Sequence, residues 1–114
     1  PPGPATPPTP PIDLRTFQRQ IERLYGERDQ ARGVEGTFVW FIEEVGELAR
    51  ALKRGEPENL REEFSDVLAW LSTLASLVGI EMEDAAGRYL PGCPRCGETP
   101  CRCLPRSVQR ALAP

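Results

Sequence analysis

Apolar residues recur three and four positions apart along most of the chain, which is the spacing of amphipathic helices. The first predicted helix covers residues 12–31, and Gly33 and Gly36 then interrupt the pattern. A second helix is predicted from Thr37, which serves as its N-cap, to Arg54. The two glycines therefore separate two predicted helices.

The clearest helical periodicity lies in residues 57–79. Pro57 suits a first helical turn, where its missing N–H has no helical partner, and Gly79 ends the pattern. A short fourth helix is predicted over residues 81–90. The apolar stripe of the third predicted helix consists of Leu60, Phe64, Val67, Leu68, Leu71, Leu74, Ala75 and Val78. The opposite face, which we expect to be solvated, carries Arg61, Ser65, Ser72 and Ser76. The sequence has no strand pattern and thus predicts an all-α fold.

The four helices form one predicted all-α domain, a four-helix bundle over residues 12–90. A core of about eighty residues is near the lower limit for independent stability, so we expect a homodimer or a dimer of dimers. Residues 1–11 contain seven of the 13 prolines and are expected to form a disordered tail. A cysteine-rich loop over residues 91–104 and a basic C-terminal tail over residues 105–114 complete the predicted organisation.

Composition narrows the possible chemistry. The chain has 14 basic and 17 acidic residues, a net charge of −3, which argues against nonspecific nucleic-acid binding. It has no histidine, which excludes Ser-His-Asp and Cys-His catalysis and leaves carboxylates, thiolates and bound cations. No apolar run approaches the roughly 18 residues that a membrane span needs, and no signal sequence is recognisable. We therefore expect a soluble, cytoplasmic protein without a membrane partner.

Acidic residues border the apolar faces of two predicted helices. On an ideal helical wheel, Glu43, Glu44 and Glu47 flank the apolar arc of the second helix. Glu63 projects from within the stripe of the third helix, and Asp66 follows one turn later. Carboxylates in such positions raise their pKa values or recruit cations, and oxygen ligands suit Mg²⁺ or Mn²⁺. The structural alternative is neutralisation by nearby arginines, namely Arg50, Arg54 or Arg61.

All four cysteines lie within eleven residues, as Cys93-x-x-Cys96 and Cys101-x-Cys103. Such clustering favours a local metal site over a disulfide framework, and four thiolates suit tetrahedral Zn²⁺. A site closed by four cysteines has no open position for water, so we predict a structural zinc ion. Two disulfides or a redox pair are the alternative.

The acidic pattern also resembles a known family. The arrangement Glu43-Glu44-x-x-Glu47, fifteen intervening residues, and Glu63-x-x-Asp66 followed by VLAWLSTLASLVGIEMEDA is similar to that of the MazG-like all-α nucleoside triphosphate pyrophosphohydrolases. The likeness covers about residues 36–90, and the cysteine-rich tail resembles the ending of some small members. It implies a MazG-like fold and Mg²⁺-dependent cleavage between the α and β phosphates. The products would be a nucleoside monophosphate and pyrophosphate, in a nucleotide-pool house-cleaning role.

The resemblance also implies roles for individual carboxylates. Glu44, Glu47, Glu63 and Asp66 would be the principal metal ligands. Glu43, which with Glu47 is a candidate catalytic residue, would help hold a further metal ion or orient the attacking water.

Substrate recognition needs cations for the phosphates and an aromatic surface for the base. Lys53, Arg88 and Tyr89 are candidates for phosphate contacts, and Trp40 or Trp70 could stack on the base. The alternative is that the tryptophans lie in the core or an oligomer interface and that Lys53 is a surface charge.

A second function also fits the sequence: a non-catalytic helical dimer, held by zinc at its cysteines, that binds protein or nucleic acid through its arginine-containing tail.

Overall fold

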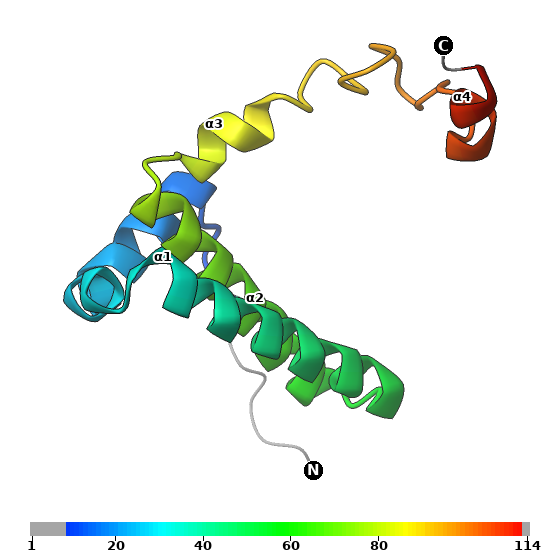
Figure 1. The fold of residues 1–114 in the computed structure, drawn as a ribbon. Coiled ribbons are helices and arrows are strands. Elements are labelled where there is room, and N and C mark those ends of the chain that lie inside the picture. Colours follow the sequence, from blue (N-terminus) through cyan, green and yellow to red (C-terminus); the bar gives the residue numbers. More distant parts are fainter. Residues whose placement is uncertain (1–8, 113–114) are drawn as a thin grey trace. The chain divides into compact units, whose positions relative to one another are not determined.

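The computed structural model describes residues 9–112, so most of the predicted proline-rich tail lies outside the described residues. The chain divides into two units, one ending at Glu83 and the other beginning at Asp84. Its helices are α1 (Leu14–Arg54), α2 (Pro57–Leu77), α3 (Met82–Gly87) and α4 (Arg106–Leu112), as Figure 1 shows. The described residues contain no strand, and the predicted all-α fold is confirmed. None of these helices combines the length and apolar character needed to cross a membrane.

Helix α1 consists of two helical segments that meet at Gly33. Gly33 has φ 79° and ψ 177°, a conformation that favours glycine, and the chain changes direction there (Figure 1). Asp13 caps the first segment, accepting a hydrogen bond from the Thr16 N–H at 2.7 Å. The predicted N-cap at Thr37 is wrong, because the second segment resumes directly after Gly33 and Thr37 lies buried inside it.

The second segment of α1 and helix α2 form a helical hairpin, in which the two helices run side by side (Figure 1). Gly55 ends α1 with a left-handed conformation at φ 71°, and its N–H donates to the Ala51 carbonyl at 2.8 Å. Pro57 occupies the first turn of α2, as predicted. Because the connection between α1 and α2 is short, the acidic residues of both helices belong to the same helical hairpin.

The face of α2 that packs against α1 differs from the predicted one. Ser72 is completely buried and Thr73 is 5% exposed, whereas the sequence pattern placed Ser72 on a solvated face. Small side chains at the contact let the two helices approach closely. The apolar stripe is instead open to solvent within the single chain, at Phe64, Leu68, Leu71 and Val78. The buried apolar residues of the described chain are Ile21, Ala51 and Met82.

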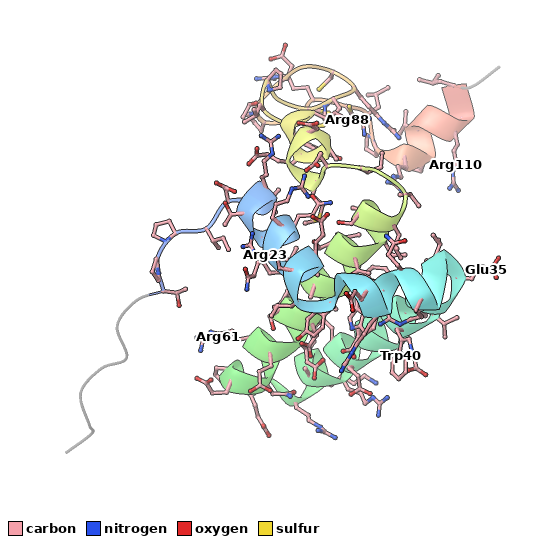
Figure 2. All side chains as sticks on the ribbon, turned by 90° about the vertical axis from the view of Figure 1, so that its left-hand side faces the viewer. Arg23, Glu35, Trp40, Arg61, Arg88 and Arg110 are labelled. Atoms are coloured by element: carbon pink, nitrogen blue, oxygen red, sulfur yellow. The ribbon has the colours of Figure 1, made fainter. Side chains whose placement is uncertain are left out.

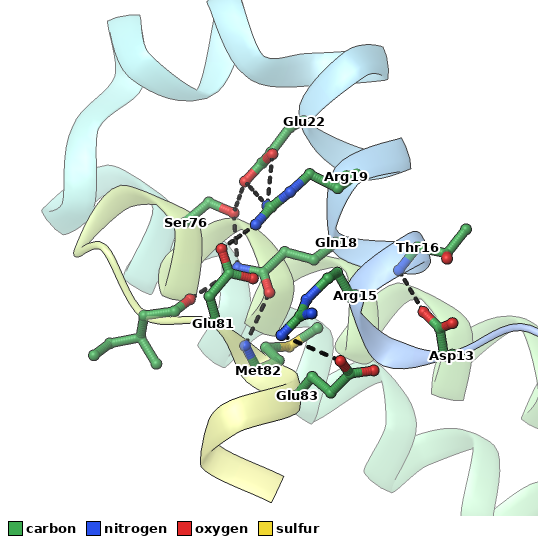
Figure 3. Close-up of polar contacts among 11 residues, drawn as sticks. Asp13, Arg15, Thr16, Gln18, Arg19, Glu22, Ser76, Glu81, Met82 and Glu83 are labelled. Carbon is green, nitrogen blue, oxygen red and sulfur yellow. Dashed lines mark hydrogen bonds and ion pairs between the residues drawn. The ribbon is translucent and has the colours of Figure 1, made fainter. Parts of the chain in front are cut away.

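Polar side chains hold the first segment of α1 against the end of α2 (Figure 3). The buried Gln18 amide donates to the Ser76 hydroxyl at 3.0 Å and to the Ile80 carbonyl at 2.9 Å. The Gln18 carbonyl oxygen accepts from the Met82 N–H at 2.9 Å, and Arg19 forms an ion pair with Glu81. Gln18 therefore fixes the turn that precedes α3, because an amide satisfies both donors and acceptors of the buried backbone.

The remaining helices differ in part from the prediction. α3 spans Met82–Gly87, which is shorter than the predicted helix over residues 81–90, and hydrogen-bonded turns continue to Leu90. The segment predicted as a C-terminal tail contains α4, a helix of seven residues.

Candidate functional site

Three carboxylates from two helices converge at the helical hairpin. Glu44 comes from the second segment of α1, and Glu63 and Asp66 come from successive turns of α2. One oxygen from each of the three lies within 4.8 Å of the others. Glu44 and Glu63 are half-buried, whereas Asp66 is exposed. We call these three residues the acidic cluster.

The acidic cluster concentrates negative charge in a partly dehydrated place. Burial raises the pKa of Glu44, and the negative charges of Asp66, Glu63, Glu47 and Glu43 raise it further. Burial also raises the pKa of Glu63, with additional repulsion from Asp66. The Oε2 atom of Glu63 is buried and has no hydrogen-bond partner. An unpartnered buried carboxylate oxygen beside two further carboxylates fits a hard divalent cation.

The two other predicted carboxylates lie around this cluster. Glu47 is not among the three residues that converge, and it forms an ion pair with Arg50 at 2.9 Å. Its charge is still near enough to raise the pKa values of Glu44 and Glu63. Glu43 is exposed and contributes to the shift of Glu44. The structure thus brings together three of the four predicted metal ligands.

Arginines do not neutralise the acidic cluster in the described part of the chain. Arg50 pairs with Glu47, and Arg61 pairs with the exposed Glu58 at 3.2 Å. Among residues 9–112, the ion pairs include none to Glu44, Glu63 or Asp66. Neutralisation by an arginine, the alternative that the sequence left open, is therefore observed for Glu47 but not for the acidic cluster.

A cavity of about 290 Å³ opens beside the acidic cluster, between the first segment of α1 and α2. Asp66 belongs to its lining, which also includes Tyr25, Arg28, Asp29, Arg32, Trp70 and Thr73. The cavity combines aromatic rings with guanidinium groups, the side chains that suit a base and phosphates. A larger cavity, of about 590 Å³, is lined by residues of the same helices but by none of the acidic cluster.

Arg32 is held in one position within the 290 Å³ cavity. Its Nη1 donates to Asp29 at 3.1 Å and to the Thr37 hydroxyl at 3.2 Å. Asp29 is buried and also accepts from the Thr73 hydroxyl at 3.1 Å. The Arg32 guanidinium carbon lies 4.8 Å from the centre of the Trp70 ring. These contacts orient a cation beside an aromatic wall.

The predicted substrate residues have varied surroundings. Trp40, labelled in Figure 2, stacks on Trp70 with ring centres 6.0 Å apart and is half exposed. Lys53 is exposed in the last turn of α1, nine residues beyond Glu44. Arg88 and Tyr89 belong to the second unit, where the Arg88 guanidinium lies 5.9 Å from the Tyr89 ring centre. Their substrate roles stay predictions.

Three cavity residues from the first segment of α1 were not predicted from the sequence, namely Tyr25, Arg28 and Arg32. A signal was available, because Arg28 and Arg32 are four positions apart and thus share a helix face. That spacing alone does not distinguish a ligand-binding face from a solvated one.

A protein-family comparison matches residues 32–91 to the MazG nucleotide pyrophosphohydrolase domain. The matched segment contains the helical hairpin and all five acidic residues that the sequence analysis selected. The chain belongs to the MazG family. Comparison with curated proteins gives no match. The matched segment begins at Arg32, so Tyr25 and Arg28 precede the MazG domain, and all four cysteines follow it.

The four cysteines form a possible metal site in the second unit. Their sulfur atoms lie within 4.8 Å of one another, and all four thiols are free. The Cys93 and Cys103 sulfurs are 3.7 Å apart, well beyond a disulfide bond length of about 2.05 Å. The backbone N–H groups of Cys96 and Arg95 lower the pKa of Cys93 to about 6, whereas hydrogen bonding with the Cys101 and Cys93 side chains raises the pKa of Cys103 to about 12.

Proposed function

We propose that the protein is a Mg²⁺-dependent nucleoside triphosphate pyrophosphohydrolase that cleaves between the α and β phosphates. The observation that carries this proposal is the convergence of the Glu44, Glu63 and Asp66 carboxylates, one of which has a buried oxygen without a hydrogen-bond partner. Membership of the MazG family supports a nucleotide substrate. The products would be a nucleoside monophosphate and pyrophosphate, consistent with removal of unwanted nucleotides from the pool.

In this proposal each carboxylate has a role set by its position. Glu44, Glu63 and Asp66 would hold Mg²⁺, and Glu47 would complete the ligand set after releasing Arg50. When bound, the ion would neutralise phosphate charge and lower the pKa of a coordinated water. Glu43 and Glu47, which border the cluster, would orient the attacking water and accept its proton. Mn²⁺ would be able to replace Mg²⁺, because both ions prefer oxygen ligands.

The 290 Å³ cavity would bind the nucleoside and part of the triphosphate. Trp70 and Tyr25 offer aromatic surface to a base, whereas Arg28 and Arg32 offer guanidinium groups to phosphate oxygens. Because Asp66 lines the same cavity, a substrate bound there would reach the acidic cluster. Trp40 would support the ring of Trp70 from its stacked position.

Arg28→Ala is expected to raise the KM for the triphosphate about tenfold and to leave kcat within about twofold. The substitution would remove a charge-assisted hydrogen bond to a phosphate oxygen, which is made equally in the ground state and the transition state. Arg28 is exposed at the cavity, so its removal leaves no buried charge unpaired. Steady-state kinetics of the purified variant measures both constants. Arg23→Ala is the control, because Arg23, labelled in Figure 2, is exposed on the same helix and does not belong to the lining of the 290 Å³ cavity. An equal change in both variants would contradict the assignment.

We also propose that the protein works as a homodimer or a dimer of dimers. Each helix of the helical hairpin presents a row of exposed apolar residues at spacings of four, three and seven, which place them on one helix face. On α1 the row consists of Phe38, Ile42, Val45 and Leu52, and on α2 it consists of Phe64, Leu68, Leu71 and Val78. Among the described residues of the helical hairpin, Ala51 is the only buried apolar one, so a second copy would supply the missing burial.

Product analysis tests the proposed reaction directly. Chelator-treated protein is incubated with a panel of ribo- and deoxyribonucleoside triphosphates, with Mg²⁺, with Mn²⁺ or without metal, and the products are separated by anion exchange. We expect monophosphate and pyrophosphate only when a metal ion is present. Diphosphate with phosphate would contradict the proposed bond cleavage. Absence of turnover across the panel, by folded protein that binds Mg²⁺, would favour the non-catalytic binding module instead.

A further inference from the structure

Among its described residues, the second unit, which contains the four cysteines, has no hydrophobic core. None of the described side chains in residues 84–108 and 110–112 is buried. Its large apolar residues are exposed, with Tyr89 at 65%, Leu90 at 88% and Leu112 at 69%. Burial of apolar surface therefore contributes little to the stability of this unit. A segment of about thirty residues in that situation needs another source of stability, such as a metal ion.

The backbone around the cysteines is ordered by hydrogen bonds. The Gly97 N–H donates to the Cys93 carbonyl at 2.7 Å, and the Cys93 N–H donates to the Glu98 carbonyl at 3.0 Å. Gly97 has φ 77°, which permits the tight turn after Cys96. These bonds close the loop that carries Cys93 and Cys96, whose sulfur atoms lie within 4.8 Å of each other.

Backbone N–H groups also point at the sulfur atoms. The Arg102 N–H donates to the Cys96 sulfur at 3.3 Å, and the Cys103 N–H donates to the Cys101 sulfur at 3.3 Å. Such donors favour thiolates over thiols, and thiolates are the form that binds soft metal ions. Four sulfur atoms within 4.8 Å of one another, with backbone donors beside two of them, suit a single soft metal ion.

We propose that Cys93, Cys96, Cys101 and Cys103 bind one Zn²⁺ ion and that this ion takes the place of a hydrophobic core in the second unit. Four sulfur ligands match the tetrahedral preference of Zn²⁺ and leave no position for water, so the ion is structural. Hard ions such as Mg²⁺ prefer oxygen ligands and do not compete for this site. Folding of residues 92–103 is then coupled to zinc binding, because the unfolded segment holds no preformed ligand set. This proposal is independent of the pyrophosphohydrolase activity, since all four ligands lie outside the matched MazG domain.

Metal content and hydrogen exchange of the full chain test the two parts of this proposal. Elemental analysis of protein purified under reducing conditions is expected to give one zinc per chain. Removal of the zinc with a chelator, in the presence of excess Mg²⁺, is expected to accelerate amide exchange in residues 92–103 at least about tenfold. Exchange in α1 and α2 is expected to stay the same. Added Zn²⁺ should restore the slow exchange.

Matched variants distinguish the loss of a zinc ligand from the effect of any substitution at the surface of the second unit. Cys96→Ser and Cys101→Ser are expected to abolish stoichiometric zinc binding and to show fast exchange at all zinc concentrations. Ser107→Ala, at an exposed position outside the cluster, is expected to behave as the unmodified chain does. Stoichiometric iron in place of zinc, or a mass that reveals disulfides in reduced preparations, would overturn the zinc assignment. Slow exchange that persists after zinc removal would overturn the role of the ion in folding.

Discussion

Replacement of Glu63 by glutamine is expected to reduce triphosphate hydrolysis at least about 100-fold, because it removes one of the three converging carboxylates that we propose as metal ligands. Glutamine keeps the size of the side chain but offers a neutral, weaker ligand. The loss is expected in kcat and kcat/KM together, since the charge that develops on the phosphates would no longer be balanced. Steady-state kinetics over a range of Mg²⁺ concentrations measures the effect. The Mg²⁺ concentration for half-maximal activity should rise in parallel.

Glu62→Gln is the matched control for this change. Glu62 is the preceding residue on α2 and is exposed, and it lies outside the acidic cluster. Its charge makes the smallest of the contributions to the raised pKa of Glu63 and it holds no place in the acidic cluster, so its replacement is expected to leave kcat within about twofold. Similar losses in both variants would mean that the activity depends on the overall charge of α2 and would contradict a ligand role for Glu63.

Thermal stability distinguishes loss of a ligand from loss of the fold. The pKa of Glu63 is raised in the folded protein by burial and by Asp66. A carboxylate with a raised folded-state pKa supports the fold while protonated, and that support is lost as the pH rises through the raised pKa. Glu63→Gln removes this repulsion, so at neutral pH without metal its Tm is expected to be no lower than that of the unmodified chain. Added Mg²⁺ should raise the Tm of the unmodified chain more than that of the variant.

The boundary between the two long helices, and the position of Glu63 and Asp66 on one helix face, could be predicted from the sequence for local physical reasons. Gly55 and Pro57 impose the left-handed end of one helix and the first turn of the next. Glu63 and Asp66 are three residues apart, so one helix face presents both, and Glu44 meets them because the hairpin is short. These relations depend on the spacing within each helix and on the length of the turn.

The packing of α2 and the cavity could not be predicted in the same way. Periodicity identifies an apolar stripe, but it does not say whether α1 or a second copy covers that stripe. The chain packs the small residues Ser72 and Thr73 against α1 and leaves Leu68 and Leu71 exposed. The cavity forms where the first segment of α1 packs beside α2, and the kink at Gly33 sets the direction of that segment. The local sequence does not specify this tertiary packing. Arg28 therefore had the sequence signature of an ordinary surface residue.

A large loss of self-association is expected when the exposed apolar rows on α1 and α2 are disrupted. Leu71→Glu is expected to weaken self-association at least about 100-fold, because a charge in the centre of an apolar interface would lose its hydration. Sedimentation velocity at several concentrations measures the oligomeric state. Leu90→Glu is the control, since Leu90 is 88% exposed and belongs to neither row. A monomeric unmodified chain, or equal behaviour of the two variants, would contradict the proposed interface.

The same substitution tests whether the acidic cluster depends on self-association. Helices α1 and α2 carry both the apolar rows and the three converging carboxylates, whose mutual repulsion pushes the two helices apart. Burial of the apolar rows against a second copy would oppose that repulsion and hold Glu44 near Glu63 and Asp66. Leu71→Glu is thus expected to lower kcat as well as the Tm, and the Tm of the unmodified chain should rise with protein concentration. The milder Leu71→Ala keeps the test usable if the glutamate variant does not fold. A monomeric but fully active variant would show that one hairpin holds the acidic cluster on its own.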